Sequence, residues 1–325
     1  MEPGFRLGVV PTLPIHAVIE LAFDPVAQVG DWHVRLQTIG LAVVILLTLL
    51  VAARVARRTP RNVDHDPDAV DPKGEPNHLR RDDLLYIAVA ALPGAVVGGR
   101  IGYALTHLPY YSANTGAILD VGQGGYELSL AVVGGTITSA AVATLLDAPI
   151  QRWMHALILP LLFGLAAGKL TMVLGGDGQG VPWDGPWATA YLGPGPWLSL
   201  APDVPSHPSQ VYEALATIGV IAVMAIVLAA GLFPRRGAGA YLFGIALWAV
   251  ARMAVAFTWR DPAVLGPLSA DQVLAIVIAT GALALLAVVT MRDESPVSGP
   301  AGPGSPRFSA DPDLDWPDPA SRPRI

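Results

Sequence analysis

Seven apolar runs, each long enough to cross a bilayer, constrain the fold of this chain more than any other feature of the sequence. A spanning helix needs about 20 consecutive, mostly apolar residues. The runs that reach or approach this length are Leu36–Ala53, Leu84–Leu105, Leu128–Leu146, Met154–Leu174, Val211–Phe233, Ala238–Thr258 and Asp271–Met291. Backbone polar groups in hydrocarbon must be satisfied internally, so each run predicts a helix rather than a loop or an open strand.

The composition also indicates a membrane protein. Of the 325 residues, 53% are hydrophobic and only 14% are charged, whereas soluble domains carry about 25% charged residues. Cysteine is absent, which excludes structural disulfides, thiolate metal sites and a cysteine nucleophile within the chain. We therefore expect an all-α, polytopic integral membrane protein with seven transmembrane helices.

The distribution of cations predicts the orientation of these helices. Cytoplasmic loops of membrane proteins are enriched in Lys and Arg. Loops 106–127 and 175–210 contain neither residue, and loop 259–270 contains only Arg260. The first loop is instead strongly basic, with Arg54, Arg57, Arg58, Arg61, Lys73, Arg80 and Arg81. The N-terminus is therefore expected outside and the C-terminus in the cytoplasm.

Three regions differ in composition from the helical domain, which we place at residues 36–292. We expect residues 1–35 to lie outside, with a short interfacial helix around Ile15 to Phe23. The prolines in this segment argue against a signal peptide. Residues 59–79 are rich in Asp, Pro, Asn and His and predict a flexible cytoplasmic linker. Residues 293–325 are rich in Pro, Ser, Gly and Asp and predict a disordered cytoplasmic tail.

A compact polar motif, His207-Pro208-Ser209-Gln210-Val211-Tyr212-Glu213, opens the fifth apolar run. Pro208 fits the first turn of a helix, and Ser206 or His207 could cap that helix. The motif puts a carboxylate, an amide, a phenol and an imidazole at the mouth of a membrane helix. Such groups are costly to bury, so they suggest a functional site. The alternative is a capped helix with a solvated polar end.

Three cations lie within the predicted helices. Arg252 is near the middle of its run, where a cost of about 2.5–3.5 kcal/mol implies a partner or a bound anion. The simplest partner is Glu213, in a structural salt bridge. Arg100 and Lys169 lie nearer helix ends and could snorkel to the interface.

The predicted outer loop, residues 175–208, is rich in Gly and Trp. It begins Gly175-Gly176-Asp177-Gly178-Gln179-Gly180, a segment that permits unusual backbone angles and the close approach of a ligand. Together with the membrane cations, the loop suits a site at the outer face that handles a lipid with an anionic headgroup. The alternative is an ordered loop without a catalytic part.

These residues together resemble the bacterial prolipoprotein diacylglyceryl transferases, over roughly residues 30–292. The resemblance rests on Gly99-Arg100-Ile101-Gly102-Tyr103, Gly134-Gly135, Gly168-Lys169, the motif from His207 to Glu213, and Arg252 with Arg260 and Pro262. Enzymes of this family move the diacylglyceryl group of phosphatidylglycerol to the thiol of a lipobox cysteine and release glycerol phosphate. They need neither a metal nor a soluble cofactor.

The resemblance implies a multi-pass enzyme of the bacterial plasma membrane. Its partners would be phosphatidylglycerol, membrane lipid and the prolipoprotein signal peptide with its lipobox cysteine, and no nucleic acid. The implied catalytic residues are Arg252, Glu213, His207 and Tyr212. Arg252, with Arg100 or Lys169, would hold the phosphate, and the other three would order the outer mouth and relay a proton. The full set implied for substrate binding is Arg100, Lys169, Gln210, Tyr103, Asp177, Gln179 and Arg260.

Several family positions carry different residues in this chain. The family histidine of the third helix falls on Ser129, and its arginine of the fourth helix falls on Lys169, which lacks the planar fork that suits a phosphate. The remaining departures are Met172 for Asn, Gln37 for Tyr and Ala256 for an acid. The alternative function is therefore that of a catalytically degenerate, lipid-binding membrane protein of the same fold. A transporter is disfavoured, because the sequence shows no inverted repeat.

Overall fold

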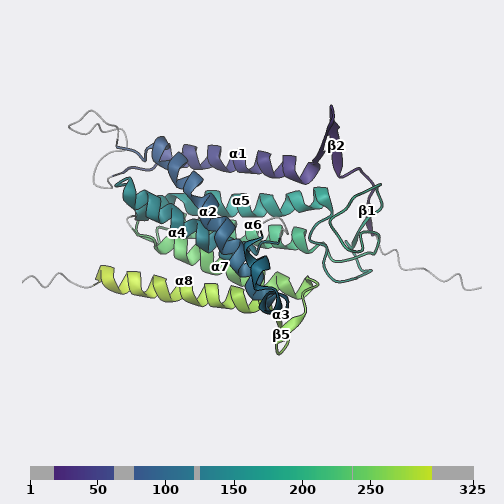
Figure 1. Cartoon of the computed structure of the whole chain (residues 1–325). Helices are drawn as coiled ribbons and strands as arrows, with labels where there is room; N and C mark the ends of the chain where they lie inside the picture. The colour runs from purple at the N-terminus through teal and green to yellow at the C-terminus, as the bar shows by residue number, and fades with distance from the viewer. Residues whose placement is uncertain (1–17, 62–76, 121–124, 236, 295–325) are drawn as a thin grey trace, which may run out of the picture.

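A computed structural model describes residues 18–61, 77–120, 125–235 and 237–294 of the chain. Within this part, seven helices are long and apolar enough to cross a membrane, which confirms the predicted number. They lie side by side in one elongated bundle, so this is a multi-pass membrane protein (Figure 1). The helices are α1 (Leu36–Arg57), α2 (Arg81–Thr106), α4 (Leu128–Leu145), α5 (Ile150–Thr171), α6 (Ser209–Ala229), α7 (Gly239–Val255) and α8 (Ala270–Glu294).

Glycines bring α2 and α4 into direct backbone contact. A Cβ atom added at Gly134 would lie 2.1 Å from the carbonyl oxygen of Gly94, and one added at Gly98 would lie 2.2 Å from that of Leu130. Small residues allow membrane helices to approach closely, which gains van der Waals contact where no hydrophobic force drives association. The glycines therefore set the distance between these two helices.

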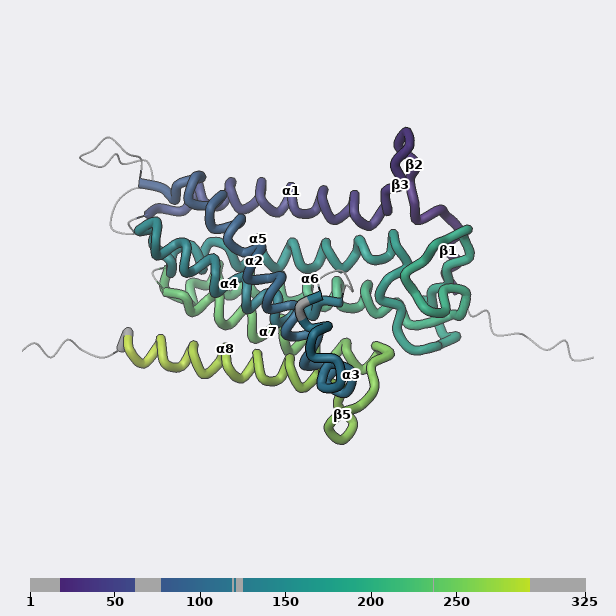
Figure 2. The backbone as a smooth tube through the Cα atoms, in the orientation of Figure 1, coloured from purple at the N-terminus to yellow at the C-terminus, as the bar shows by residue number. Residues whose placement is uncertain are grey.

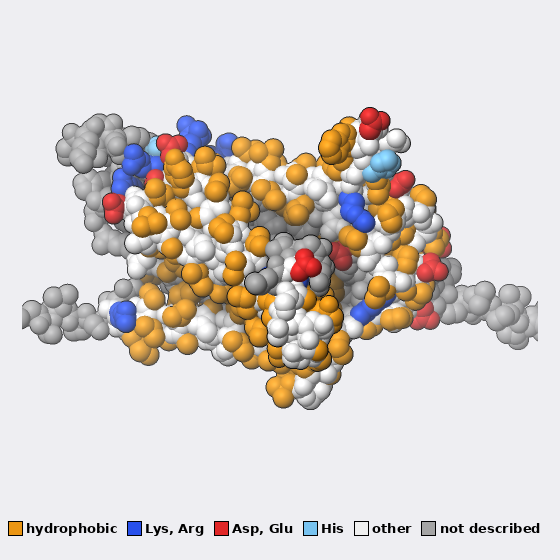
Figure 3. Space-filling model, viewed as in Figure 1, with side chains coloured by type: hydrophobic (Ala, Val, Ile, Leu, Met, Phe, Trp, Pro, Cys, Tyr) orange, Lys and Arg blue, Asp and Glu red, His pale blue; other side chains and the backbone are white. Residues whose placement is uncertain are grey.

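The main core lies between α5, α6, α7 and α8. Ile158, Leu162, Met224 and Trp248 are almost completely buried there. Leucine and valine side chains on the outward helix faces are exposed instead, and apolar groups cover much of the bundle surface (Figure 3). An apolar outer surface is what contact with lipid requires.

Short strands and loops gather at the end of the bundle where α1 and α8 begin (Figure 2). Strand β1 (Ile19–Leu21) pairs in parallel with β4 (Thr189–Tyr191), β2 (Val26–Val29) pairs with β3 (Trp32–Arg35), and β5 (Ala263–Leu265) pairs with β6 (Leu268–Ser269). The all-α prediction thus holds for the bundle and not for this end. The helix predicted around Ile15 to Phe23 is wrong in its described part, because these residues find a strand partner in the distant segment 175–208.

The remaining short elements connect or extend the spanning helices. They are α3 (Leu108–Ala113) and the 3₁₀ turns η1 (Thr115–Leu119), η3 (Met172–Gly175) and η4 (Ala256–Thr258).

Parts of the predicted flexible regions are ordered at their edges. The Leu79 N–H donates to the carbonyl oxygen of Thr59 at 3.0 Å, and Leu79 is buried, so both ends of the linker 59–79 are held together. Helix α8 continues to Glu294, two residues into the predicted tail. Residues 1–17, 62–76 and 295–325, on which the other predictions for these regions fall, lie outside the described residues.

Candidate functional site

Five charged side chains meet inside the bundle and form what we call the ion cluster: Glu127, Lys169, Glu213, Arg252 and Asp271. Arg252 donates from one terminal nitrogen to Glu213 Oε1 at 2.6 Å, and from the other to Asp271 Oδ2 at 3.0 Å and Glu127 Oε1 at 3.3 Å. Lys169 Nζ lies 3.0 Å from Glu213 Oε2. The predicted contact between Arg252 and Glu213 is therefore confirmed.

Several helix ends contribute side chains to this cluster. The sign of each of these charges suits the end of the helix that carries it. Asp271 lies in the first turn of α8, while Lys169 and Arg252 lie in the last turns of α5 and α7. The helix dipole favours an anion at the N-terminus and a cation at the C-terminus. The prediction that Arg252 lies near the middle of its helix is wrong, because α7 ends at Val255 and the chain continues as the η4 turn.

Glu127 belongs to the cluster and also caps α4. Its carboxylate accepts hydrogen bonds from the N–H groups of Ser129 and Leu130, both at 2.7 Å. These are N–H groups that lack a partner within the helix. One carboxylate thus fixes the start of α4 and reaches Arg252.

Burial makes the charges of the cluster strongly interdependent. The exposed fraction of the side chain is 1% for Glu213, 8% for Arg252, 10% for Lys169 and 25% for Asp271. Among the described residues, two cations face three carboxylates, so the cluster carries an excess of one negative charge. Asp271 is the member that solvent or a ligand reaches most easily.

Lys169 is held on two sides. Besides Glu213, its ammonium group lies 4.8 Å from the centre of the Trp259 ring, a distance that gives a cation–π interaction. The prediction that Lys169 could snorkel to the interface is wrong. Its side chain is buried because the ion cluster and the indole replace water as partners.

Arg100 is buried too, but it does not join the ion cluster. Its guanidinium donates to the carbonyl oxygens of Ala117 at 2.6 Å, Ile118 at 2.8 Å and Asp120 at 2.9 Å. It fastens the η1 turn against α2, so the expected snorkelling of Arg100 is also wrong. Tyr103, one turn further along α2, stacks on His107 with ring centroids 4.0 Å apart.

The motif from His207 to Glu213 has residues both in the segment 175–208 and in helix α6. His207 stacks on Trp183 with ring centroids 4.2 Å apart and an interplanar angle of 9°, and its Nδ1 lies 3.5 Å from the Tyr212 hydroxyl. Burial lowers the pKa of His207 below its ordinary value of 6.5, so the imidazole is neutral at pH 7. Only Glu213, one turn into α6, joins the ion cluster.

The start of α6 differs from the predicted cap. The helix begins at Ser209, directly after Pro208, without a side-chain cap. The predicted cap from Ser206 or His207 is wrong, because Ser206 donates instead to the carbonyl oxygen of Val204. Ser209 donates to the carbonyl oxygen of Thr258 at 3.0 Å and so ties α6 to the η4 turn that follows α7.

Three of the residues implied in substrate binding make hydrogen bonds that hold the segment 175–208. Gln210 donates to the Tyr191 hydroxyl at 3.0 Å, Gln179 to the carbonyl oxygen of Thr189 at 2.9 Å, and Arg260 to that of Gly180 at 2.5 Å. Burial raises the pKa of Tyr191 to about 12, so this phenol stays protonated at neutral pH. These contacts order the segment against the start of α6 and against the residues that follow α7.

The glycines of this segment permit a close approach between parts of the chain itself. A Cβ atom at Gly180 would lie 2.1 Å from the carbonyl oxygen of Thr258. Gly178 has a φ of +77°, a left-handed conformation that other residues rarely adopt. Asp177 directly precedes Gly178 in the chain, and its Oδ2 atom lies 3.5 Å from Gln37 Nε2.

The sequence by itself indicates no role for Glu127 or Asp271. Each is an acidic residue at the start of a helix, which by itself indicates only a favourable interaction with the helix dipole. The structure shows that both carboxylates contact Arg252. Ala256, at the position where the family has an acidic residue, supplies no carboxylate. Ser129, at the position of the family histidine, is buried, and its hydroxyl has no hydrogen-bond partner among the described residues.

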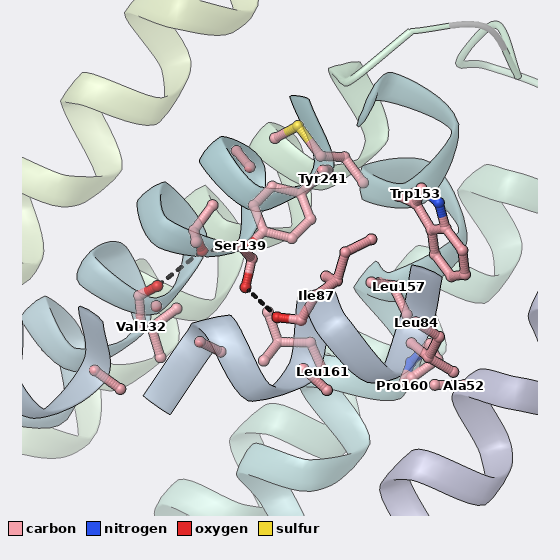
Figure 4. A pocket seen from close by; sticks show the side chains of 18 of the residues that line it. Ala52, Leu84, Ile87, Val132, Ser139, Trp153, Leu157, Pro160, Leu161 and Tyr241 are labelled. Atoms are coloured by element: carbon pink, nitrogen blue, oxygen red, sulfur yellow. Dashed lines mark hydrogen bonds between the residues drawn. The ribbon is translucent and has the colours of Figure 1, made fainter. Parts of the chain in front are cut away.

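An apolar cavity of about 380 Å³ lies between α1, α2, α4 and α5 (Figure 4). It is lined along α4 from Leu128, the residue after Glu127, to Ala143, a length of about 22 Å at 1.5 Å per residue. The Ser139 hydroxyl at its wall donates to the carbonyl oxygen of Ile87 at 2.9 Å and is therefore satisfied. An apolar chamber thus begins next to a buried cluster of charges.

Comparison with known proteins agrees with the sequence resemblance. The chain matches the family described as prolipoprotein diacylglyceryl transferase over residues 25–288. It is 28% identical over 293 residues to the phosphatidylglycerol–prolipoprotein diacylglyceryl transferase of Gluconobacter oxydans, a match that covers 87% of this chain and 98% of the relative. The protein of the same name from Gluconacetobacter diazotrophicus is 29% identical over 294 residues, which cover 86% and 95% of the two chains.

A third relative of this name, from Polynucleobacter necessarius, is 34% identical over 171 residues. That match covers 50% of this chain and 59% of the relative, so it spans less than two thirds of that protein. The match to the family covers most of the helical bundle, including every member of the ion cluster. The chain therefore belongs to the prolipoprotein diacylglyceryl transferase family.

Proposed function

We propose that this protein transfers the diacylglyceryl group of phosphatidylglycerol to the thiol of a prolipoprotein lipobox cysteine. The observation that carries the proposal is the buried ion cluster at one end of an apolar cavity. Buried cations suit the phosphate of the lipid, and the cavity suits its acyl chains. The relatives named above bear this activity in their names. A prolipoprotein substrate would place the enzyme in the bacterial plasma membrane.

The reaction needs a proton acceptor and stabilisation of the leaving group. A carbon–sulfur bond forms between the cysteine and the glyceryl carbon, and the bond from that carbon to the phosphate oxygen breaks. Glycerol phosphate leaves with the bonding electron pair, while the thiol proton passes to a base. Arg252 and Lys169 would stabilise the negative charge on the departing phosphate.

Asp271 is our candidate for the base. It is the most exposed carboxylate of the cluster and lies 3.0 Å from Arg252. A proton accepted by Asp271 would neutralise its carboxylate and weaken its bond to Arg252. The guanidinium would then be free to bind the phosphate as charge develops there. Glu213, buried and paired with both cations, would keep them in position.

The other residues implied by the family have supporting roles in this proposal. His207 and Tyr212 would order the mouth of the site through their contacts with each other and with Trp183. Tyr103 and Asp177 would contact the substrate headgroup. Arg100, Gln179, Gln210 and Arg260 would hold the surrounding backbone in place through the hydrogen bonds described above.

Orientation is a further part of the proposal, with the N-terminus and the segment 175–208 outside and the C-terminus in the cytoplasm. The cation bias of the loops supports this orientation. Reporter fusions after Arg58 and after Arg292 should read cytoplasmic, and one near Gly185 should read external. A cytoplasmic signal at Gly185 would refute it.

Variants of Lys169 test the function. In phosphatidylglycerol vesicles with a lipobox peptide, we expect the purified protein to transfer diacylglyceryl groups. Lys169→Arg should keep or raise turnover, because a guanidinium can bind two phosphate oxygens at once. Lys169→Ala should lower turnover by about 100-fold, the usual effect of removing one donor that stabilises an anionic transition state.

Two further variants test whether the effects on turnover come from the ion cluster. Arg54→Ala removes a cation from the last turn of α1, outside the ion cluster, and should leave turnover unchanged. Asp271→Asn should lower kcat more than it changes KM if Asp271 accepts the thiol proton. If well-folded wild-type protein binds phosphatidylglycerol and transfers nothing, the protein is the degenerate lipid binder instead.

A further inference from the structure

A second cavity lies at the opposite end of the bundle, where α1 ends and α5 begins. On α5, His155 in this cavity and Lys169 in the ion cluster are separated by about 21 Å at 1.5 Å per residue. The cavity has a volume of about 280 Å³. The lining residues that matter for its chemistry are Val55, Arg58, Arg152, His155, Leu159, Leu228 and Arg235.

The walls of this cavity are fixed by a buried arginine. Arg152 donates from Nε and from one terminal nitrogen to the carbonyl oxygen of Pro60, at 3.1 Å and 2.6 Å. Its other terminal nitrogen donates to the carbonyl oxygen of Arg235. One side chain thus joins α5 to the segments that follow α1 and α6. Hydrogen bonds to the backbone therefore hold the walls of the cavity in place.

The polar groups of the cavity are positive or neutral. Arg58 and Arg235 lie exposed at its rim, and no carboxylate in the described part of the chain pairs with either. None of the described residues that line the cavity is acidic. His155 Nδ1 is buried without a hydrogen-bond partner among the described residues. Three guanidinium groups and an unpartnered imidazole nitrogen favour an anion that accepts several hydrogen bonds.

The apolar part of the lining identifies what kind of anion fits. Val55, Leu159 and Leu228 come from α1, α5 and α6 and lie on the side of the cavity toward the middle of the bundle. Basic side chains gather at this end of the molecule, beside its apolar belt (Figure 3). Basic pockets between membrane helices bind the headgroups of anionic lipids. Pockets for whole ligands measure about 300–1,000 Å³, so this volume suits a headgroup with its chains outside.

We propose that this cavity binds the phosphate group of an anionic phospholipid, at a site separate from the ion cluster. Arg58 and Arg235 would contact the phosphate oxygens from the rim, and His155 would donate from Nδ1 within the cavity. Arg152 would hold the walls and add its charge. The apolar side chains would contact the glyceryl group and the first carbons of the acyl chains.

The test uses lipid binding and not transfer, so its outcome is independent of the proposed enzyme activity. Full-length protein in detergent is titrated with dioleoylphosphatidic acid, and bound lipids are counted by native mass spectrometry. We expect Arg58→Gln/Arg235→Gln to lose one bound lipid, with a dissociation constant at this site raised about tenfold or more. His155→Leu should weaken the same binding step.

The matched control is Arg54→Gln/Arg57→Gln, which removes two exposed charges from the same end of α1 outside the cavity. It should bind as many lipids as the wild type, and dioleoylphosphatidylcholine should not fill the site. Equal losses in both double variants would overturn the proposal, since any surface charge would then suffice. If millimolar inorganic phosphate binds at this site and dioleoylphosphatidic acid does not, the site binds free phosphate and the phospholipid assignment is wrong.

Discussion

Arg252→Gln is expected to abolish diacylglyceryl transfer and to lower the free energy of unfolding by about 3–5 kcal/mol. Removing the guanidinium leaves Lys169 as the one cation of the described cluster, facing three carboxylates. A buried charge without a partner keeps its desolvation cost and loses its attraction. The effect should therefore exceed that of removing any surface cation of this chain.

A double-mutant cycle separates the pairing from other effects of the substitution. Unfolding is followed in detergent for Arg252→Gln, Glu213→Gln and the double variant. The double variant should be less destabilised than the sum of the single variants, by at least about 0.5 kcal/mol, because Glu213 needs Arg252 only while it is charged. Additive effects, or an unchanged melting temperature for Arg252→Gln, would contradict the pairing. Arg252→Lys reports whether charge alone restores transfer.

Gly134→Ala is expected to have the second large effect, this time on the fold alone. The added methyl group would lie 2.1 Å from the carbonyl oxygen of Gly94, a backbone atom that no side-chain rotation can move away. Overpacking of a core typically costs about 1–3 kcal/mol. Here α2 and α4 must separate along their shared surface, so we expect a loss at or above the upper end of that range.

Gly219→Ala and Gly281→Ala are the matched controls for this prediction. A Cβ atom at either position meets no heavy atom within 4 Å, and both residues lie in spanning helices. Both controls should leave the melting temperature unchanged or raise it, because alanine has the higher helix propensity. Equal melting temperatures for Gly134→Ala and the controls would show that α2 and α4 do not depend on this contact.

The spanning helices were predictable because hydrophobic length is a local property of the chain. Leu36–Ala53 and Ala238–Thr258 were recognised from composition alone, and the structure places α1 and α7 there. The family was also predictable, since it depends on short motifs such as the one from His207 to Glu213. Helix ends were less certain, because capping and 3₁₀ turns depend on contacts made after folding, as η4 shows after α7.

The tertiary structure alone decided which charges meet. Glu127 and Asp271 are far apart in the sequence, and each was only an acid at a helix start until packing brought both to Arg252. Packing also bound Arg100 to the carbonyl oxygens around η1. Ile19–Leu21 became a strand through pairing with residues 189–191. A sequence fixes the cost of burying each group, but the partner that offsets the cost is chosen by the packing of distant elements.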